Sequence, residues 1–281
     1  MPEFSTLIPV GLQHPTIRQY LAIKNAKNTT HSYAENRVSI EGQRMLTMVL
    51  KAQLEIHALF VCPQLLRGEI SRSTVRTIVA SGVPSFLVNE KVLCRITEWD
   101  GPDGLAAIVQ LPRFRWQDIQ LGQHNALLVL DGLQIPGNVG TIIRCADGII
   151  ITNKRQHLTH PKLLRASMGS LFSFPVIDTD VTEAITWLKR HHFTIVTTET
   201  NATLSYRSAS YRGRVAIVMG NEHCGISHAW HEAQDMSVAI PMNGQSDSLN
   251  VGNAAVLMQY EMLYHQDRLI YKFRIAIVYT N

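Results

Sequence analysis

Polar and glycine residues gather in three loops in the second half of the chain, and each loop follows an apolar run. After ALLVLDG (126–132) comes Asn138 and, six residues later, Arg144. Glu222 comes after VAIVMG (215–220), and SDSLN (246–250) comes after SVAIPM (237–242). Such apolar runs, separated by helical segments, predict a parallel sheet, whose ligands bind beyond the carboxyl ends of its strands. The three loops are therefore expected to share one binding site.

Each of these features also has an ordinary structural explanation when it is taken alone. GNVG is a turn with a helix cap about as readily as a phosphate cradle, and it is not the GxGxxG fingerprint of dinucleotide-binding folds. Clusters such as SDSLN often only cap a helix, because Ser, Asp and Asn accept hydrogen bonds from the first helical turn. A lone Glu222 or Arg144 is typical of a solvated surface. The combination at the ends of separate strands is what indicates chemistry.

The order of the elements predicts two α/β domains. Residues 32–111 alternate between strand-like and helix-like segments, and residues 125–265 form a second α/β series with buried strands. Residues 112–124 are the expected linker, residues 1–31 a basic extension with a short helix, and residues 266–281 a tail with no assigned role. The second domain is expected to close with a helix that begins near Val251.

Composition limits the classes of protein to which the chain can belong. With 281 residues and 46% hydrophobic composition, it can bury one or two real cores. The four cysteines lack CxxC spacing, so reduced thiols are expected and a zinc site is not. The first residues, MPEFSTLIPVGL, lack a basic region before an apolar stretch, and no apolar run is long enough for a membrane span. A cytoplasmic protein is expected, and its net charge of +4 suits a polyanionic partner.

Four segments of the second domain carry a resemblance to a known family. LDGLQIPGNVGTIIRCAD, PKLLRASMGSLFSFPV, IVMGNEHCGIS and VAIPMNGQSDSLNVGNAA resemble the signature motifs of TrmH-like SPOUT methyltransferases, in the order the family has them. The resemblance implies S-adenosylmethionine as cofactor, a C-terminal trefoil knot, a homodimer and methylation of a ribose 2′-hydroxyl in RNA. Residues 32–111 resemble, more weakly, the L30e-like RNA-binding domain of ribosomal RNA methyltransferases of the avilamycin and thiostrepton resistance type.

The resemblance also implies roles for individual residues. The implied catalytic set is Arg144, Asn138, Glu222, Ser248 and Asn250. The implied cofactor-binding set is Thr198, Glu199, Gly220, Asn221, Ile240, Met242, Ser248 and Leu249. The expected RNA contacts are Lys24, Lys27, Arg37, Arg44 and Arg165. Because a guanidinium is effectively always protonated, we expect Arg144 to orient the hydroxyl or its neighbouring phosphate instead of acting as a literal base.

Two other functions are alternatives to RNA methyltransferase. A dinucleotide oxidoreductase requires GxGxxG and an acid about twenty residues later, and neither follows ALLVLDG. A non-catalytic RNA-binding paralogue would share the fold and the basic charge, so it stays open. For the RNA, 23S ribosomal RNA is the first expectation and tRNA the second; no DNA, membrane or metal partner is expected.

The first motif departs from the family in length. RCADGIIITN passes from Arg144 to an apparent strand in about five residues fewer than relatives use. This spacing predicts a shortened, strained crossover, with a helix of about nine residues over Val139–Asp147. Gly148 is expected to stop the helix and reverse the chain. Either the helix ends within a turn of Arg144, or the next strand starts late, near Ile150 or Ile151. Such strain would lower activity if it displaced Arg144.

Overall fold

The computed structural model describes residues 4, 6–25, 36–98, 101–144, 147–242 and 248–268. The chain divides into two compact units: the first combines Met1–Arg113 with His157–Ser173, and the second combines Phe114–Gln156 with Phe174–Asn281. The first unit thus contains a segment that sequence reasoning placed in the second domain. The linear division at residues 112–124 stays a prediction.

The second unit is built on a parallel sheet. Within the described residues its seven strands lie in the order β10-β12-β9-β11-β6-β7-β8, and every pairing is parallel. The strands are β6 (Asn125–Asp131), β7 (Gly148–Thr152), β8 (Val176–Asp178), β9 (Thr194–Thr198), β10 (Leu204–Ser205), β11 (Arg214–Met219) and β12 (Met236–Ala239). All residues of β6 and β7 are buried, as expected of strands covered on both faces.

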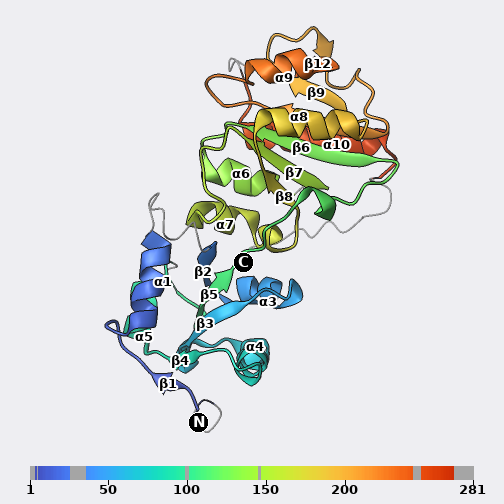
Figure 1. Cartoon of the computed structure of the whole chain (residues 1–281). Helices are drawn as coiled ribbons and strands as arrows, with labels where there is room; N and C mark the ends of the chain where they lie inside the picture. The colour runs from blue at the N-terminus through green and yellow to red at the C-terminus, as the bar shows by residue number, and fades with distance from the viewer. Residues whose placement is uncertain are drawn as a thin grey trace. The chain divides into compact units, whose positions relative to one another are not determined.

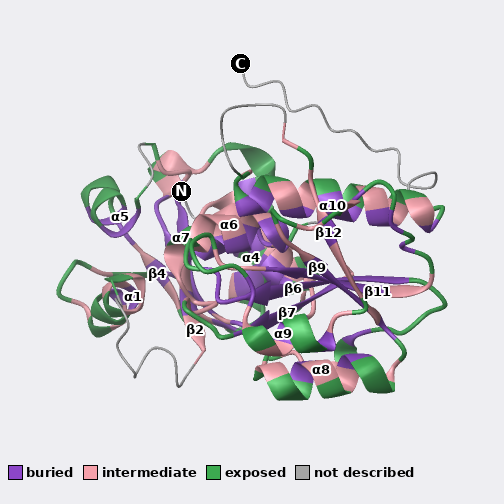
Figure 2. Cartoon of the chain, turned by 90° about the horizontal axis from the view of Figure 1, so that it is seen from above, coloured by how far each residue is buried: buried purple, intermediate pink, exposed green. Residues whose placement is uncertain are grey.

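Helices cover both faces of this sheet. On one face, α8 (Val181–Arg190) and α9 (His228–Ala233) pack over side chains that include Leu127, Val129 and Ile150. On the other face lie α6 (Pro136–Ile142) and α10 (Val251–His265), which contact each other (Figure 2). A short 3-10 helix, η3 (Trp116–Asp118), precedes the first strand. Because helices cover both faces, a ligand is expected to bind at the ends of the strands.

The crossover after β6 differs in its details from the one that the sequence predicted. Helix α6 covers Pro136–Ile142, so the expected span Val139–Asp147 is wrong at both ends. The helix begins earlier because Pro136 occupies its first turn, where a missing N–H costs nothing. Gly148 does not reverse the chain; it is the first residue of β7, which runs in register with β6 from Leu127 onward. Of the two alternatives expected for this crossover, the helix does end within a turn of Arg144, and the strand does not start late.

The first unit is a smaller α/β structure with a mixed sheet. Among the described residues the strand order is β1-β4-β3-β5-β2, with β5 antiparallel to both of its neighbours. Its strands are β1 (Ile8–Pro9), β2 (Arg37–Glu41), β3 (Ile56–Val61), β4 (Ser85–Leu87) and β5 (Leu105–Gln110). Its helices are α1 (Pro15–Asn25), α3 (Gln43–Lys51), η2 (Pro63–Leu65), α4 (Gly68–Ala80), α5 (Glu90–Ile96), α7 (Pro161–Ser167) and η4 (Ser170–Phe172). Figure 1 shows the order of these elements along the chain. Sequence reasoning missed α5.

The turn between β2 and α3 depends on a glycine. Gly42 has a φ of 86°, a left-handed value that side chains disfavour. Its neighbour Gln43 donates its backbone N–H to Asp103 Oδ2 at 2.7 Å, so the aspartate caps a helix that has no side-chain cap of its own. Gly42 and Asp103 therefore serve the fold of this unit.

Candidate active site

Two of the three polar loops meet through Asn138 and Glu222. Asn138 lies in α6, just beyond β6, and donates from Nδ2 to Glu222 Oε1 at 2.9 Å. Glu222 lies in the turn after β11, and its other carboxylate oxygen is 3.5 Å from the backbone nitrogen of Gln134. Since β6 and β11 are neighbours in the sheet, their carboxyl ends bring these loops together.

The third loop joins the same chain of hydrogen bonds. Asn250 donates from Nδ2 to Asn138 Oδ1 at 3.2 Å, while its own Oδ1 accepts from the backbone N–H of Gly252 at 2.9 Å. Asn250 is thus the N-cap of α10 and a partner of α6 at once. Asn138 uses both ends of its carboxamide, as acceptor from Asn250 and as donor to Glu222. Asn138 therefore joins three segments that are far apart in the sequence.

Asp131, which sequence reasoning did not single out, holds the ends of β6 and β7 and the turn after β11. It is 2% exposed, and its Oδ1 accepts from Thr152 Oγ1 at 2.9 Å and from Asn153 Nδ2 at 2.7 Å. Its Oδ2 accepts the backbone N–H of Ser227 at 2.7 Å. A buried carboxylate with three donors is well compensated. The signal in the sequence was an aspartate closing an otherwise apolar run.

The turn after β11 leaves no room for a side chain at its first residue. A Cβ on Gly220 would lie 2.6 Å from the backbone nitrogen of Ile226 and closer still to the carbonyl carbon of Gly225. Asn221 then fixes the turn: its Nδ2 donates to Gly132 O at 2.6 Å, and its backbone N–H donates to Gly225 O at 2.8 Å. Backbone groups therefore form the surface of this turn.

Arg144 and Ser248 are exposed and stand apart from this network. Arg144 follows α6 by two residues, and its backbone N–H donates to Thr141 O at 3.3 Å. Within the part of the chain that the structure describes, no hydrogen bond joins the side chain of Arg144 or Ser248 to Asn138, Glu222 or Asn250. The structure thus brings together three of the five expected catalytic residues, and the other two are exposed.

The residues expected to bind a cofactor follow β9, β11 and β12. Thr198 donates from Oγ1 to Val218 O at 2.9 Å, which ties the ends of β9 and β11. The carboxylate of Glu199 accepts from Ser237 Oγ at 2.9 Å and lies 3.5 Å from His231 Nδ1. Ile240, Met242 and Leu249 are half-buried apolar residues that follow β12 in the chain. Apolar side chains and backbone groups of this kind are what a purine needs, since it takes a stacking surface and partners along its edge.

The residues expected to bind RNA are only partly available. Arg44 is exposed on α3, whereas Lys24 donates from Nζ to Ile96 O at 2.7 Å and Arg37 is half-buried. Arg165, on α7, forms an ion pair with Glu98. Lys27 lies outside the described residues.

A cavity of about 280 Å³ in the first unit is lined by several of these groups. Its charged lining residues include Lys24, Glu41, Arg44, Arg67, Glu98, Asp103 and Arg165. Burial raises the pKa of the Glu41 carboxyl, and the neighbouring Glu98 adds to this rise, while the Glu98 backbone N–H, Lys24 and Arg165 oppose it. Burial lowers the pKa of His160, which precedes α7. The cavity thus holds opposed charges at close range, and Arg44 is the exposed residue among the four described ones that were expected to bind RNA.

The described residues contain no cluster of three or more His, Cys, Asp or Glu side chains arranged to hold a metal. None of the helices in the described part of the chain has the length and apolar character required to cross a membrane.

Comparison with known proteins gives the family. Residues 125–260 match the SpoU rRNA Methylase family. A crystal structure of an RNA 2′-O ribose methyltransferase superposes with a TM-score of 0.77 at 30% identity, covering 92% of this chain and 99% of that chain. The chain belongs to the SpoU rRNA methylase family. The resemblance to TrmH-like SPOUT methyltransferases, and the α/β fold class that it implied, are confirmed.

Further comparisons extend the likeness over both units. Residues 15–107 match an MRM3-like substrate binding domain. The AdoMet-bound rRNA methyltransferase of Sinorhizobium meliloti has a TM-score of 0.80 at 28% identity and covers 92% of this chain and 98% of its own. RlmP of Bacillus subtilis (strain 168), a 23S rRNA (guanosine(2553)-2′-O)-methyltransferase, is 25% identical over 232 residues, or 81% of this chain and 88% of RlmP.

Proposed function

We propose that this protein transfers a methyl group from S-adenosylmethionine to a ribose 2′-hydroxyl of 23S ribosomal RNA. The observation that carries the proposal is the chain of hydrogen bonds from Asn250 through Asn138 to Glu222, which assembles three family motifs at one end of the sheet. Membership of the SpoU family and the 23S rRNA substrate in the name of RlmP support the reaction and the RNA class.

The cofactor site we propose lies beyond β9, β11 and β12. Backbone groups near Gly220, Ile240 and Leu249 would bind the adenine edge, with Leu249 against its face, and Thr198, Glu199, Asn221, Met242 and Ser248 would complete the wall. When bound, S-adenosylmethionine supplies a methyl group already activated by a sulfonium. The turn after β11 suits this role because Asn221 holds its backbone from both sides.

In the proposed mechanism the protein mainly aligns the attack and helps to remove a proton. Arg144 orients the 2′-hydroxyl or the adjacent phosphate, and the proton leaves to that phosphate or to water. Asn138 and Asn250 hold the floor of the site, Glu222 fixes the loop after β11, and Ser248 contributes a hydroxyl. The Arg144 side chain is exposed, and a guanidinium suits a phosphate because it contacts the phosphate oxygens through several parallel N–H groups.

The two units take different parts in this proposal. We assign RNA docking to the domain at residues 32–111, with Arg44 as its exposed cation and Lys24, Lys27, Arg37 and Arg165 as supporting charges, and methyl transfer to residues 125–265. The site would be completed by a trefoil knot in the second unit and by a homodimer. An RNA substrate of this class also places the protein in the cytoplasm.

Calorimetry and a methylation assay test the function directly. Titration with S-adenosylmethionine should show saturable binding, and incubation with radiolabelled cofactor should label protein-free 23S rRNA more than bulk tRNA. Mapping of the RNA should place the label on a ribose 2′-oxygen. Binding without transfer to any RNA would favour the non-catalytic RNA-binding paralogue, and preferential labelling of tRNA would move the substrate to that class.

A further inference from the structure

Helix α10 contacts residues on both sides of Arg144, one near the start of the helix and one just beyond its end. At its start, Asn250 bonds to Asn138 of α6, and Gly252 packs where a Cβ would lie 3.9 Å from Thr141 Cγ2. At its end, the side chain of Arg268 reaches Asp147, three residues beyond Arg144. Contacts from α10 and from the residue just after it therefore hold Asn138 before Arg144 and Asp147 after it.

The position of Arg268 is fixed by the way α10 ends. Asp267 has a left-handed φ of 53°, its N–H donates to Tyr264 O at 3.1 Å, and the N–H of Arg268 donates to Leu263 O at 2.9 Å. This pattern of two backbone bonds around a left-handed residue is the Schellman motif. Just before it, Gln266 is 5% exposed and donates from Nε2 to Gly213 O at 2.9 Å. The backbone from which Arg268 projects is thus rigid.

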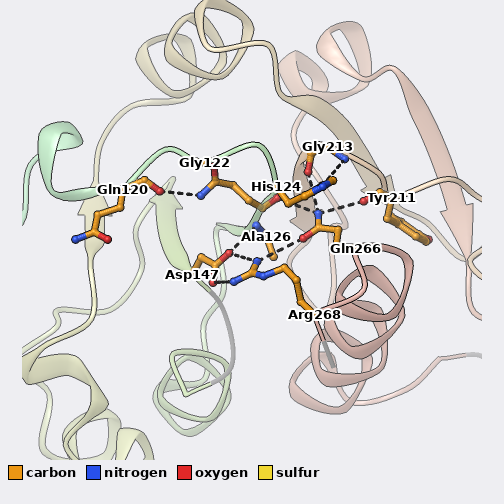
Figure 3. A network of polar contacts seen from close by, with 10 residues as sticks. Gln120, Gly122, His124, Ala126, Asp147, Tyr211, Gly213, Gln266 and Arg268 are labelled. Atoms are coloured by element: carbon orange, nitrogen blue, oxygen red, sulfur yellow. Dashed lines mark hydrogen bonds and ion pairs between the residues drawn. The ribbon is translucent and has the colours of Figure 1, made fainter. Parts of the chain in front are cut away.

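Asp147 receives this arginine with both carboxylate oxygens. Arg268 donates one N–H to Asp147 Oδ1 at 2.6 Å and another to Oδ2, which is the two-pronged geometry that suits a guanidinium and a carboxylate (Figure 3). Oδ2 also accepts the backbone N–H of Ala126 at 3.0 Å, and the Asp147 N–H donates to Ala126 O at 3.0 Å. Asp147 therefore links the base of β6 to the end of α10.

We propose that Arg268 and Asp147 form a clamp that positions Arg144 for methyl transfer. The inference rests on the proposed function of Arg144. Helix α6 ends at Ile142, two residues before Arg144, so the position of Arg144 depends on what holds the chain beyond the helix. Side chains that set the geometry of a reacting group can matter greatly, because a misplacement of about 1 Å costs roughly 100-fold in rate. The clamp supplies, from a distant part of the sequence, the rigidity that a longer α6 would give.

Substitution of Arg268 by glutamine tests the clamp. Arg268→Gln should lower the single-turnover rate of methyl transfer about tenfold or more, with the affinity for S-adenosylmethionine unchanged in calorimetry. Arg268→Lys, which keeps the charge, should recover part of the rate. Arg190→Gln, at an exposed position on α8, is the matched control and should transfer at the wild-type rate.

Hydrogen exchange of the protein without cofactor gives a second readout. Amides of Ile143, Arg144 and Asp147 should exchange faster in Arg268→Gln than in the wild type, whereas those of β9 and β12 should not change. A wild-type rate in Arg268→Gln or a parallel loss of cofactor affinity would each overturn the clamp. A wild-type protein without transferase activity would refute the proposed function instead, and unchanged exchange at these three amides would still overturn the inference.

Discussion

Asn138 is the residue at which the three loops of the candidate site are joined. Its donor end faces the carboxylate of Glu222 and its acceptor end faces the amide of Asn250. Asn138→Asp should therefore replace an N–H donor by a charge of the same sign as Glu222. We expect a loss of about 1 kcal/mol in the free energy of unfolding, because the pair is partly exposed.

Exchange of the donor and the acceptor in the Asn138–Glu222 pair tests whether this hydrogen bond contributes to stability. Glu222→Gln in the Asn138→Asp background restores a donor opposite a carboxylate, so it should recover most of the lost stability in urea unfolding. A double variant no more stable than the sum of its single changes would contradict the contact.

Removal of the Arg144 side chain should separate binding from chemistry. Arg144→Ala is expected to abolish methyl transfer while the affinity for S-adenosylmethionine stays nearly the same, because the arginine is proposed to act on the ribose and phosphate. Calorimetry and single-turnover transfer measure the two effects. Equal losses in both would show that Arg144 supports the cofactor pocket and not the substrate.

Glu41 gives the first unit a pH-dependent stability. Burial raises the pKa of its carboxyl in the folded protein, so folding favours the protonated form. The folded state then binds more protons than the unfolded state, and this contribution to stability falls as pH rises from the ordinary carboxyl range through the raised pKa. Glu41→Gln should therefore gain stability relative to the wild type at pH about 8 and lose that advantage at pH about 4.

Urea unfolding of both proteins at the two pH values measures this difference. The glutamine keeps one acceptor for the Glu98 backbone N–H, which Glu41 now meets with both oxygens at 3.1 and 3.0 Å. Loss of the second acceptor adds an offset that does not depend on pH. A stability difference that is the same at both pH values would contradict the role of burial.

At the scale of elements, the turn after β11 depends on the absence of a side chain at Gly220. A methyl group there would lie 2.6 Å from the backbone nitrogen of Ile226, so the turn would have to move. Gly220→Ala should lower the free energy of unfolding by about 2 kcal/mol and weaken binding of S-adenosylmethionine. Gly137→Ala in α6 is the matched control, because nothing lies within 4 Å of the added Cβ.

The control should be neutral or slightly stabilising, since alanine favours a helix by up to about 1 kcal/mol over glycine. Thermal unfolding and calorimetry of the two alanine variants measure both effects. Normal cofactor affinity in Gly220→Ala would show that the turn can shift without damage to the site.

Sequence patterns predicted the elements of the second unit better than their bounds. Continuous apolar runs identified β6, β7 and β11 because strands buried on both faces cannot alternate. The same reasoning placed Gly148 at a reversal, although it is a strand residue packed against Leu127. A glycine that relieves crowding inside a sheet looks the same in sequence as one that ends a helix. Local patterns cannot separate these two uses.

In the candidate site, too, some residues could be predicted from the sequence and others could not. Asn138, Glu222 and Asn250 could be named because each follows an apolar run, and the structure joins them. The role of Asp147 could not be predicted, because its partner Arg268 lies 121 positions away and beyond the end of a helix. Contacts at that separation are set by the packing of α10 on the sheet and leave no periodic trace in the chain.

At the scale of the whole molecule, the outer face of α10 indicates how the protein assembles. Leu257, Tyr260 and Tyr264 are 41%, 57% and 68% exposed, and their spacing of three and four residues sets them along one face of the helix. Gly252 and Ala255 are buried within the protomer, so the small residues of this helix serve the packing against α6 and the sheet. An exposed apolar stripe of this kind is typical of a subunit interface.

The dimer proposed above should depend on this stripe. Light scattering at micromolar concentration should give the mass of a dimer for the wild type and of a monomer for the double variant Leu257→Glu with Tyr260→Glu, because two carboxylates per subunit would be buried against their copies. Ile70→Glu is the matched control: Ile70 is 73% exposed on α4 of the first unit and is not part of the stripe, so its variant should stay dimeric. A monomeric wild type would refute the dimer. A dimeric double variant would move the interface to another face, and the transfer rates of these variants would then show whether the active site needs the second subunit.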